Sequence, residues 1–271
     1  MGLFDKKTCA VCGKEQRIMG LTLADGNYLC SDCFHKYLYS ESTTLRDAYK
    51  KEAKYHSHIS SKDLTLEQYH ALVQLREENL EELKDFQCTK SFCGIAHFDW
   101  DASEAIFVDS SIVADKKRLY KENPPVFKME NLAFVRMTFS DNNSSVTVTG
   151  KAKAESKINL ILGFDDPVYD IIYMEIGKIT VKAGMFGTKT NITKDVDELM
   201  QAISELLSWE ISWSAENDVD IPAANMDSYW RLAKKAKDCG YLSSDDIKAC
   251  LRNYYGKDRK LMREVKKMYD L

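Results

Sequence analysis

Eight cysteines are the residues of this chain best suited to chemistry, and four of them form two Cys-x2-Cys pairs. Cys9 and Cys12 make the first pair, Cys30 and Cys33 make the second, and seventeen residues separate the two. Four thiolates in close pairs match the tetrahedral, sulfur-rich coordination that Zn²⁺ adopts in proteins. The protein would fill all four positions, which leaves none for a reactive water. We therefore expect one structural Zn²⁺ per chain, bound by these four cysteines.

A redox role is the alternative for the paired cysteines. A thioredoxin-like Cys-x-x-Cys needs a βαβ context, which the surrounding sequence lacks. The other four cysteines are scattered, so we expect reduced thiols that pack as small hydrophobes and no disulfide framework. They are Cys88, Cys93, Cys239 and Cys250.

Cys88, Cys93 and His97 have the spacing of a second metal site. The segment 92–99 is predicted to be one strand, in which Cys93 and His97 would lie about 13 Å apart at about 3.3 Å per residue. That separation is too large for one ion, so we expect no second site. None of the five histidines stands near a Ser or Cys in a recognisable activating pattern, and the chain has no phosphate-binding or nucleophile-elbow motif. The sequence therefore predicts a protein that is not an enzyme.

Composition and charge set the broad class. The chain has 271 residues, of which 44% are hydrophobic and 30% charged, which is typical of a globular protein of one large or two to three small domains. No apolar run approaches the ~20 residues of a membrane helix, and the first residues lack a signal core, so we expect a cytoplasmic protein. The net charge of −4 divides into +6 for residues 231–271 and −10 for residues 1–230. The basic tail indicates an acidic partner or nucleic acid, or else a solvated helix face or a contact with the body of the chain itself.

The paired cysteines are predicted to lie in a zinc ribbon over residues 1–40. Two short strands should flank a hairpin turn at Asp25-Gly26, and the second cysteine pair should open a helix. The segment Phe4-Asp-Lys-Lys, the Cys-x-x-Cys-Gly that follows it and the stretch from Leu23 to Cys33 resemble an uncharacterised amino-terminal zinc-ribbon family of bacterial and phage proteins. That resemblance implies zinc and no particular reaction.

Residues 41–86 are predicted to be connecting helices that pack on the next domain. Thr65 and Gln68 have the spacing of a capping box, and an apolar stripe follows them at helical intervals.

Residues 87–213 change to the period of short strands and are predicted to form a small antiparallel barrel or sandwich, closed by a helix over about 195–213. Turn signals at 141–144, 165–167 and 177–178 separate these strands. Seven or eight short strands are expected, and seven strands with one terminal helix are similar to the PH-like or GRAM-like plan. The expected strands are 92–99, 104–109, 125–129, 132–140, 145–151, 157–164, 168–176 and 179–186.

Residues 222–271 are predicted to form a tail of three helices, interrupted at Gly240 and Gly256. The run from Leu232 to Leu251 resembles the short carboxy-terminal helical hairpin called SHOCT, which implies oligomerisation or docking. The chain departs from that pattern at Tyr241 and Leu242 and adds a basic third helix. The inner faces of the first two helices are expected to carry the contact, through Tyr229, Leu232, Ile247, Leu251 and Tyr254.

The sequence as a whole predicts an α+β multidomain protein with a zinc ribbon, a PH-like β domain and a helical tail. The favoured function is a non-catalytic zinc-binding adaptor that binds a protein partner and can self-associate through its tail, including a bacterial or phage protein that modulates a partner. The alternative is a nucleic-acid-binding regulator that uses the zinc ribbon and the basic tail. The near-neutral charge of residues 1–40 argues against that alternative.

Overall fold

A computed structural model gives a mixed α and β protein with several small antiparallel sheets. The described residues fall into two compact units. The first unit takes in the described part of Met1–Lys50, Ser57–Phe86 and Ser111–Val126, and the second that of Lys51–His56, Gln87–Ser110 and Phe127–Leu271. The structure describes residues 6–16, 20–34, 53–57, 63–146, 152–184, 187–192, 194–207 and 226–271.

The first unit begins with two short antiparallel hairpins and one helical turn. These are β1 (Lys7–Thr8), β2 (Glu15–Gln16), β3 (Gly20–Thr22), β4 (Tyr28–Cys30) and α1 (Ser31–Phe34). β1 pairs with β2, and β3 pairs with β4. The predicted Asp25-Gly26 hairpin is confirmed: Gly26 has φ of 83°, and the Asn27 N–H donates to the Asp25 carboxylate at 3.2 Å. Glycine is favoured at this position because it adopts positive φ without steric cost.

The long helix α2 (Leu66–Asp85) completes the first unit with the short helix α4 (Lys116–Glu122). The predicted capping box is confirmed, because Thr65 accepts from the Gln68 N–H at 3.2 Å and Gln68 accepts from the Thr65 N–H at 2.9 Å. α4 and the preceding turn α3 (Ser110–Val113) were not predicted. They are too short to show helical periodicity, and the signal that marks α4 is its N-cap Asp115.

The second unit contains a four-stranded antiparallel sheet in the order β6-β7-β8-β9. The prediction of one strand over 92–99 is wrong. Cys93 and Gly94 have φ of 54° and 68°, as in a type I′ turn, and the Ile95 N–H donates to the Phe92 carbonyl at 3.1 Å. The chain therefore reverses inside the predicted strand. The four strands are β6 (Lys90–Phe92), β7 (Ala96–Asp99), β8 (Glu104–Phe107) and β9 (Phe127–Lys128).

The larger sheet of the second unit has the order β10-β11-β12-β13, with β5 paired to β12. Its strands are β5 (Ala53–Ser57), β10 (Leu132–Val146), β11 (Ala152–Phe164), β12 (Tyr169–Gly184) and β13 (Gly187–Ile192). The turns predicted at 141–144 and 177–178 are wrong, because β10 and β12 continue through them. The strand pairing shifts register near these points instead, between Asn142 and Ser145 and between Ile158 and Asn159, and the strands continue on either side. Residues 147–151, predicted to end a strand, lie outside the described part.

Aromatic side chains hold the two sheets of the second unit together. The ring centroids of Phe127 and Phe164 lie 4.7 Å apart, and Phe107 is 6.2 Å from Phe164. The helix α5 (Lys194–Leu207) contacts β6 and the 3-10 turn η1 (Met129–Asn131). The sequence left a barrel or a sandwich open. Among the described strands no sheet closes on itself, so the closed barrel is wrong and the structure has two packed open sheets.

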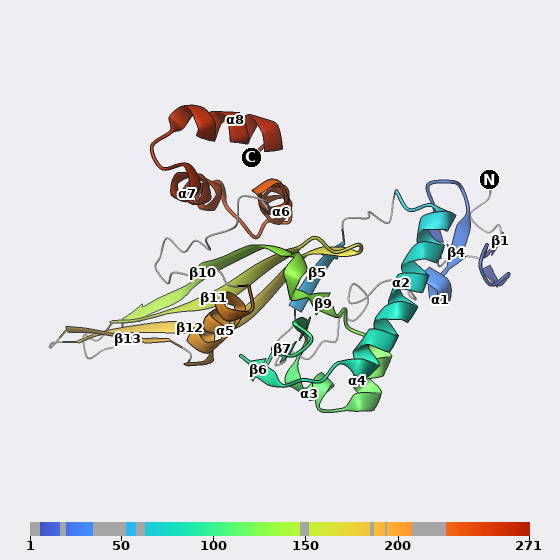
Figure 1. Ribbon diagram of the computed structural model, residues 1–271, viewed down its shortest axis with the longest axis horizontal. Helices are drawn as coiled ribbons and strands as arrows, with labels where there is room; N and C mark the ends of the chain where they lie inside the picture. Colours follow the sequence, from blue (N-terminus) through green and yellow to red (C-terminus); the bar gives the residue numbers. More distant parts are fainter. Residues whose placement is uncertain are drawn as a thin grey trace. The chain divides into compact units, whose positions relative to one another are not determined.

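The three predicted tail helices are confirmed as α6 (Met226–Asp238), α7 (Ser244–Tyr255) and α8 (Arg259–Tyr269). Gly240, with φ of 79°, follows α6, and Ser243 caps α7 by accepting from the Asp246 N–H at 3.1 Å. α6 contacts β10, β11 and β12, and α7 and α8 contact α6 (Figure 1). The tail is thus part of the core of the second unit.

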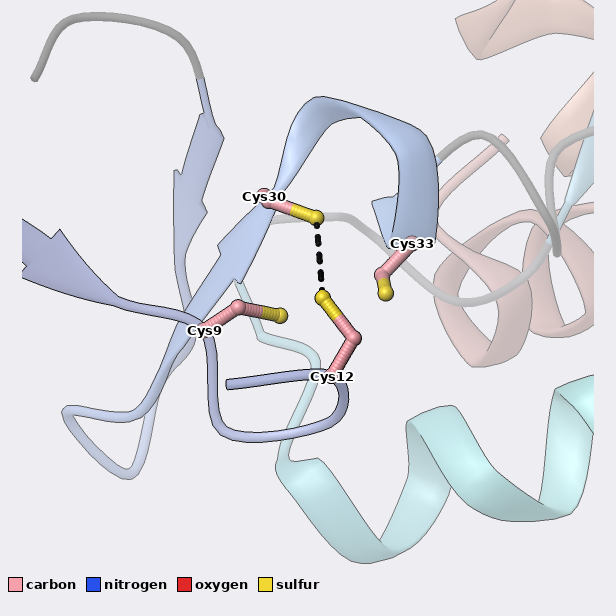
Figure 2. Close-up of side chains that lie close together, drawn as sticks. All are labelled: Cys9, Cys12, Cys30 and Cys33. Carbon is pink, nitrogen blue, oxygen red and sulfur yellow. Dashed lines mark hydrogen bonds between the residues drawn. The ribbon is translucent and has the colours of Figure 1, made fainter. Parts of the chain in front are cut away.

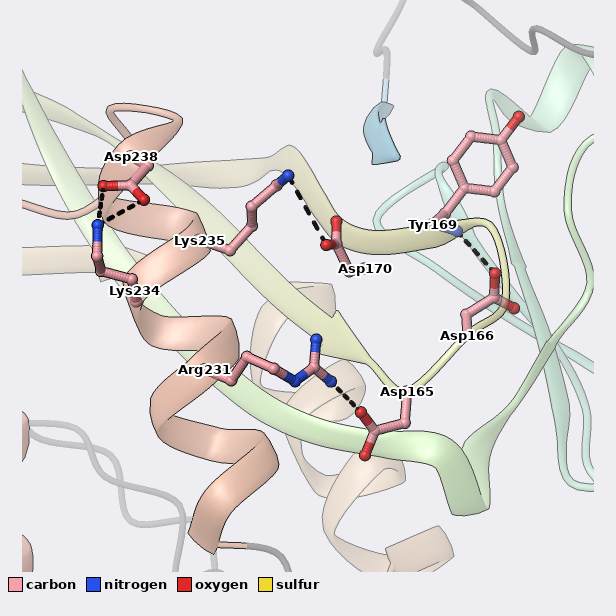
Figure 3. Close-up of polar contacts among 8 residues, drawn as sticks. All are labelled: Asp165, Asp166, Tyr169, Asp170, Arg231, Lys234, Lys235 and Asp238. Carbon is pink, nitrogen blue, oxygen red and sulfur yellow. Dashed lines mark hydrogen bonds and ion pairs between the residues drawn. The ribbon is translucent and has the colours of Figure 1, made fainter. Parts of the chain in front are cut away.

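α6 approaches the sheet closely at Gly163. A Cβ atom at this residue would lie 2.8 Å from the Phe134 Cβ and 3.0 Å from the Leu232 Cβ, so glycine is required for the contact. Polar pairs flank it (Figure 3): Arg231 pairs with Asp165, and Lys235 lies 3.8 Å from the buried Asp170.

In the described part of the chain, none of the helices combines the length and the hydropathy needed to cross a membrane.

We expect Gly163→Ala to lower the free energy of unfolding of the second unit by about 1–3 kcal/mol, because the added methyl overpacks the contact with α6. Denaturant unfolding followed by the fluorescence of the buried Trp230 measures this change. Leu232→Ala removes the Leu232 Cδ1 atom, which would lie 3.1 Å from the added methyl, and serves as the matched partner in a double-mutant cycle. The double variant should be less destabilised than the sum of the two single variants, and strict additivity would contradict the close contact.

Candidate metal centre

The four paired cysteines lie together in the first unit. The sulfur atoms of Cys9, Cys12, Cys30 and Cys33 all fall within 4.8 Å of one another, and the sulfurs of Cys12 and Cys30 are 3.6 Å apart. Figure 2 shows the four side chains directed toward a common centre. A metal with bonds of about 2.3 Å to four sulfurs would place them about 3.8 Å apart. The cluster therefore needs only a small contraction to bind one ion.

Backbone hydrogen bonds shape the loop that carries the first two ligands. The Cys9 N–H donates to the Lys14 carbonyl at 3.0 Å, and the Gly13 N–H donates to the Cys9 carbonyl at 2.9 Å. Gly13 has φ of 71°, a left-handed conformation that glycine adopts most readily. The Ala10 N–H donates to the Tyr28 carbonyl at 2.8 Å and so attaches this loop to β4.

Burial and hydrogen bonding act in opposite directions on the thiols. Cys9, Cys30 and Cys33 are buried, and Cys12 is exposed. Burial opposes ionisation of Cys9, but backbone hydrogen bonds from Cys30, Cys12 and Val11 outweigh it and lower the pKa of Cys9 to about 6. Burial, followed by hydrogen bonds from the other thiols, raises the pKa of Cys33. Hydrogen bonding thus favours the thiolate of Cys9 and burial favours the thiol of Cys33, and a cation at the centre would favour ionisation of the cysteines that bind it.

α2 supports the cluster from outside the ligand set. The hydroxyl of Tyr69, a buried residue, donates to the Cys33 carbonyl at 2.7 Å. The Asp25 carboxylate accepts from the Leu66 N–H at 2.8 Å, at the first turn of α2. An exposed ion pair of 2.7 Å joins Lys14 to Asp32 and so links the two cysteine pairs. Unlike the predicted connecting helix, α2 shares the first unit with the cysteine cluster.

The donor set indicates what the centre can do. Four protein sulfurs complete a tetrahedral shell, so a bound ion has no open position for a substrate or an activated water. Apart from the cysteines, the buried apolar side chains among the described residues 6–34 are Leu23 and Leu29. Metal binding would therefore supply folding energy that such a small core cannot provide.

The second set of candidate ligands does not form a metal site. The cysteine cluster is the one group of three or more close potential ligands among the described residues.

However, the expectation that no histidine lies near a Ser or Cys is wrong: His97 Nδ1 is 2.8 Å from Ser91 Oγ and 3.9 Å from Cys88 Sγ. The missed signal is the Cys93-Gly94 turn, which folds β6 back on β7 and pairs Ser91 with His97.

We expect the purified chain to contain about one metal ion, measured by elemental mass spectrometry. Cys30→Ser should lower this content sharply and weaken the folding of the first unit, because losing a ligand removes energy that also drives folding. Cys88→Ser is the matched control, since Cys88 lies outside the cluster, and it should retain the metal. Metal-free protein from a reducing, chelator-free preparation would contradict the assignment.

Comparisons with protein-family models, with curated proteins and with solved structures find no match to the chain.

Proposed function

We propose that the protein is a zinc-binding adaptor that acts by binding a protein partner and not by catalysis. The cysteine cluster would hold one structural Zn²⁺ in the first unit, and the carboxy-terminal helices of the second unit would carry the partner site. The observation that carries this proposal is a cationic groove on α7 and α8.

Zinc is the metal that this donor set favours. Soft thiolate ligands select Zn²⁺, Cu(I) or iron–sulfur clusters, and two Cys-x2-Cys pairs in short hairpins are typical of structural zinc. Three buried sulfurs and a complete tetrahedral shell support a structural and not a catalytic ion.

The groove has a volume of about 220 Å³ and lies between α7 and α8. Two apolar side chains, Leu251 and Met262, line it. Five cations surround them, with α7 and α8 both contributing. These are Lys248, Arg252, Arg259, Arg263 and Lys266.

The charges of the groove are poorly balanced by the chain itself. Lys248 pairs with Asp245 at 2.7 Å. Within the described residues, the side chains of Arg259, Arg263 and Lys266 have no carboxylate at ion-pair distance. Clustered like charges attract an oppositely charged partner, and an apolar pocket inside the cluster favours a bulky apolar side chain. An acidic segment that carries such a side chain matches both features.

The side chains expected to mediate self-association are mostly used within the chain. Tyr229, Leu232, Ile247 and Leu251 are each at most 2% exposed. Tyr229 packs on Phe134 of β10 with ring centroids 5.1 Å apart. A partner that binds the tail must therefore contact its outer side, where the groove lies.

The family resemblances remain part of this proposal. Two hairpins around paired cysteines support a zinc ribbon. Two packed antiparallel sheets followed by α5 support a PH-like domain, and α6 and α7 support a SHOCT-like hairpin that docks on its own β domain. These likenesses concern element order, and they imply binding roles only.

A nucleic-acid-binding regulator is the second candidate, and the cations on α8 and immediately before it favour this function. Neutralising about six phosphates would make the logarithm of affinity fall with that of salt with a slope near −5. The apolar lining of the groove favours the protein partner, because phosphates gain nothing from the half-buried Met262. The cations concerned are Lys257, Arg259, Lys260, Arg263, Lys266 and Lys267.

We expect the double variant Arg259→Glu/Arg263→Glu to lose the specific partner in affinity purification from the native cell, measured by quantitative mass spectrometry. Each substitution places a carboxylate at the groove and repels an acidic segment. Lys257→Glu/Lys260→Glu is the matched control, because it makes the same charge change on residues that do not line the groove.

The control should retain the partner, and nuclease treatment should not release it. If both double variants lose the same material and nuclease removes it, the nucleic-acid reading replaces the adaptor. If no protein differs between the two variants, the groove is not the partner site.

A further inference from the structure

Three side chains with acid–base and nucleophilic chemistry meet at one edge of the smaller sheet. Ser91 of β6 stands directly opposite His97 of β7 in the strand register. Ser91 Oγ lies 2.8 Å from His97 Nδ1, and Cys88 Sγ lies 3.2 Å from Ser91 Oγ. The partner-binding proposal makes no use of this cluster.

The hydrogen bonds set the protonation state of the imidazole. His97 Nε2 lies 3.0 Å from the carbonyl oxygen of Val108, which can only accept. Nε2 therefore carries the proton of the neutral ring, and Nδ1 must accept. Ser91 consequently donates its hydroxyl proton to Nδ1 and leaves its oxygen free to accept from the Cys88 thiol. The Lys90 carbonyl, 3.6 Å from Cys88 Sγ, is a longer alternative acceptor for that thiol.

The two ends of this chain differ in burial. Cys88 and Ser91 are exposed, whereas His97 is 1% exposed. Ser91 also lines a cavity of about 340 Å³ together with Phe92 of β6 and Gln201 of α5. A small solute can therefore reach the thiol and the hydroxyl but not the base behind them.

We propose that Cys88 is a site of oxidation by small peroxides, with Ser91 and His97 as its proton relay. The thiol sulfur attacks one peroxide oxygen, forming an S–O bond as the O–O bond breaks. The thiol proton passes through the Ser91 hydroxyl to His97 Nδ1 and returns by the same path to the departing hydroxide. The thiol and hydrogen peroxide thus become a sulfenic acid and water.

Burial of His97 explains why a peroxide fits this site. Burial lowers the pKa of His97, outweighing the opposing effects of the Val108 carbonyl and of Asp109. A charged imidazolium would therefore be short-lived, and the relay suits a reaction whose leaving group takes the proton back. Hydroxide needs that proton, whereas the iodide released by an alkylating agent does not.

Site-resolved mass spectrometry of the full chain can test this relay. The reagents are hydrogen peroxide with a sulfenic-acid trap and, separately, iodoacetamide. Ser91→Ala should slow oxidation of Cys88 about a hundredfold, at the lower end of general acid–base effects, and should slow alkylation by less. Because Ser91 is exposed, this substitution should leave the fold intact. His97→Gln, which cannot take up a proton, should have the same effect.

Cys239 is the internal control, because it is half-buried and burial raises its pKa. Its reaction with both reagents should be unchanged by Ser91→Ala. Oxidation of Cys88 at the same rate in Ser91→Ala and the unmodified chain would overturn the relay. Equal slowing with both reagents would overturn the assignment to peroxides, since the relay would then only remove the thiol proton.

Discussion

The small amino-terminal module depends on keeping four sulfur atoms together where apolar burial is scarce. Its strands are two or three residues long, so they contribute few ladder hydrogen bonds. Small modules of this kind need a cross-link or a metal to offset the entropy of ordering the chain. Contacts with α2 stabilise the module: the Tyr69 hydroxyl donates to the Cys33 carbonyl, and the Asp25 carboxylate accepts from the first turn of α2. A helix outside the cysteine loops thus holds Cys33 and the turn at Asp25 in place.

In the second unit, the larger sheet packs on both of its faces around Gly163 and Phe164. Phe164 packs on the aromatic rings of the smaller sheet, and the adjacent Gly163 accepts α6 on the opposite face. Phe134 lies opposite Gly163 in the register and contacts Tyr229 of α6. A register shift between Leu132 and Phe134 turns β10, so that Leu132 shares the face of its partner Phe164 and Phe134 shares the face of its partner Gly163. This irregularity therefore lets β10 contribute to the packing on both faces of the sheet.

Local signals could be predicted from the sequence, and signals that depend on pairing could not. The cysteine cluster, the Thr65 capping box and the three tail helices depend on residues within a few positions of one another, and all appear in the structure. The predicted break at Gly177 failed because pairing with β11 carries β12 through it. The Cys93-Gly94 turn was missed because apolar neighbours on both sides resemble one continuous strand. β5 was missed because its pairing partner lies more than a hundred residues away.

The same distinction explains why the cations of the groove could be predicted from the sequence and the relay could not. The cations of the groove lie on two consecutive helices, so the charge of the tail already indicates them. The relay exists only because a turn places Ser91 opposite His97, and because β8 ends where the Val108 carbonyl meets the ring. The turn requires a positive φ at Cys93, a conformation that costs free energy for a residue other than glycine. The surrounding packing must offset that free energy, and the strained turn holds Ser91 and His97 in the geometry of the relay.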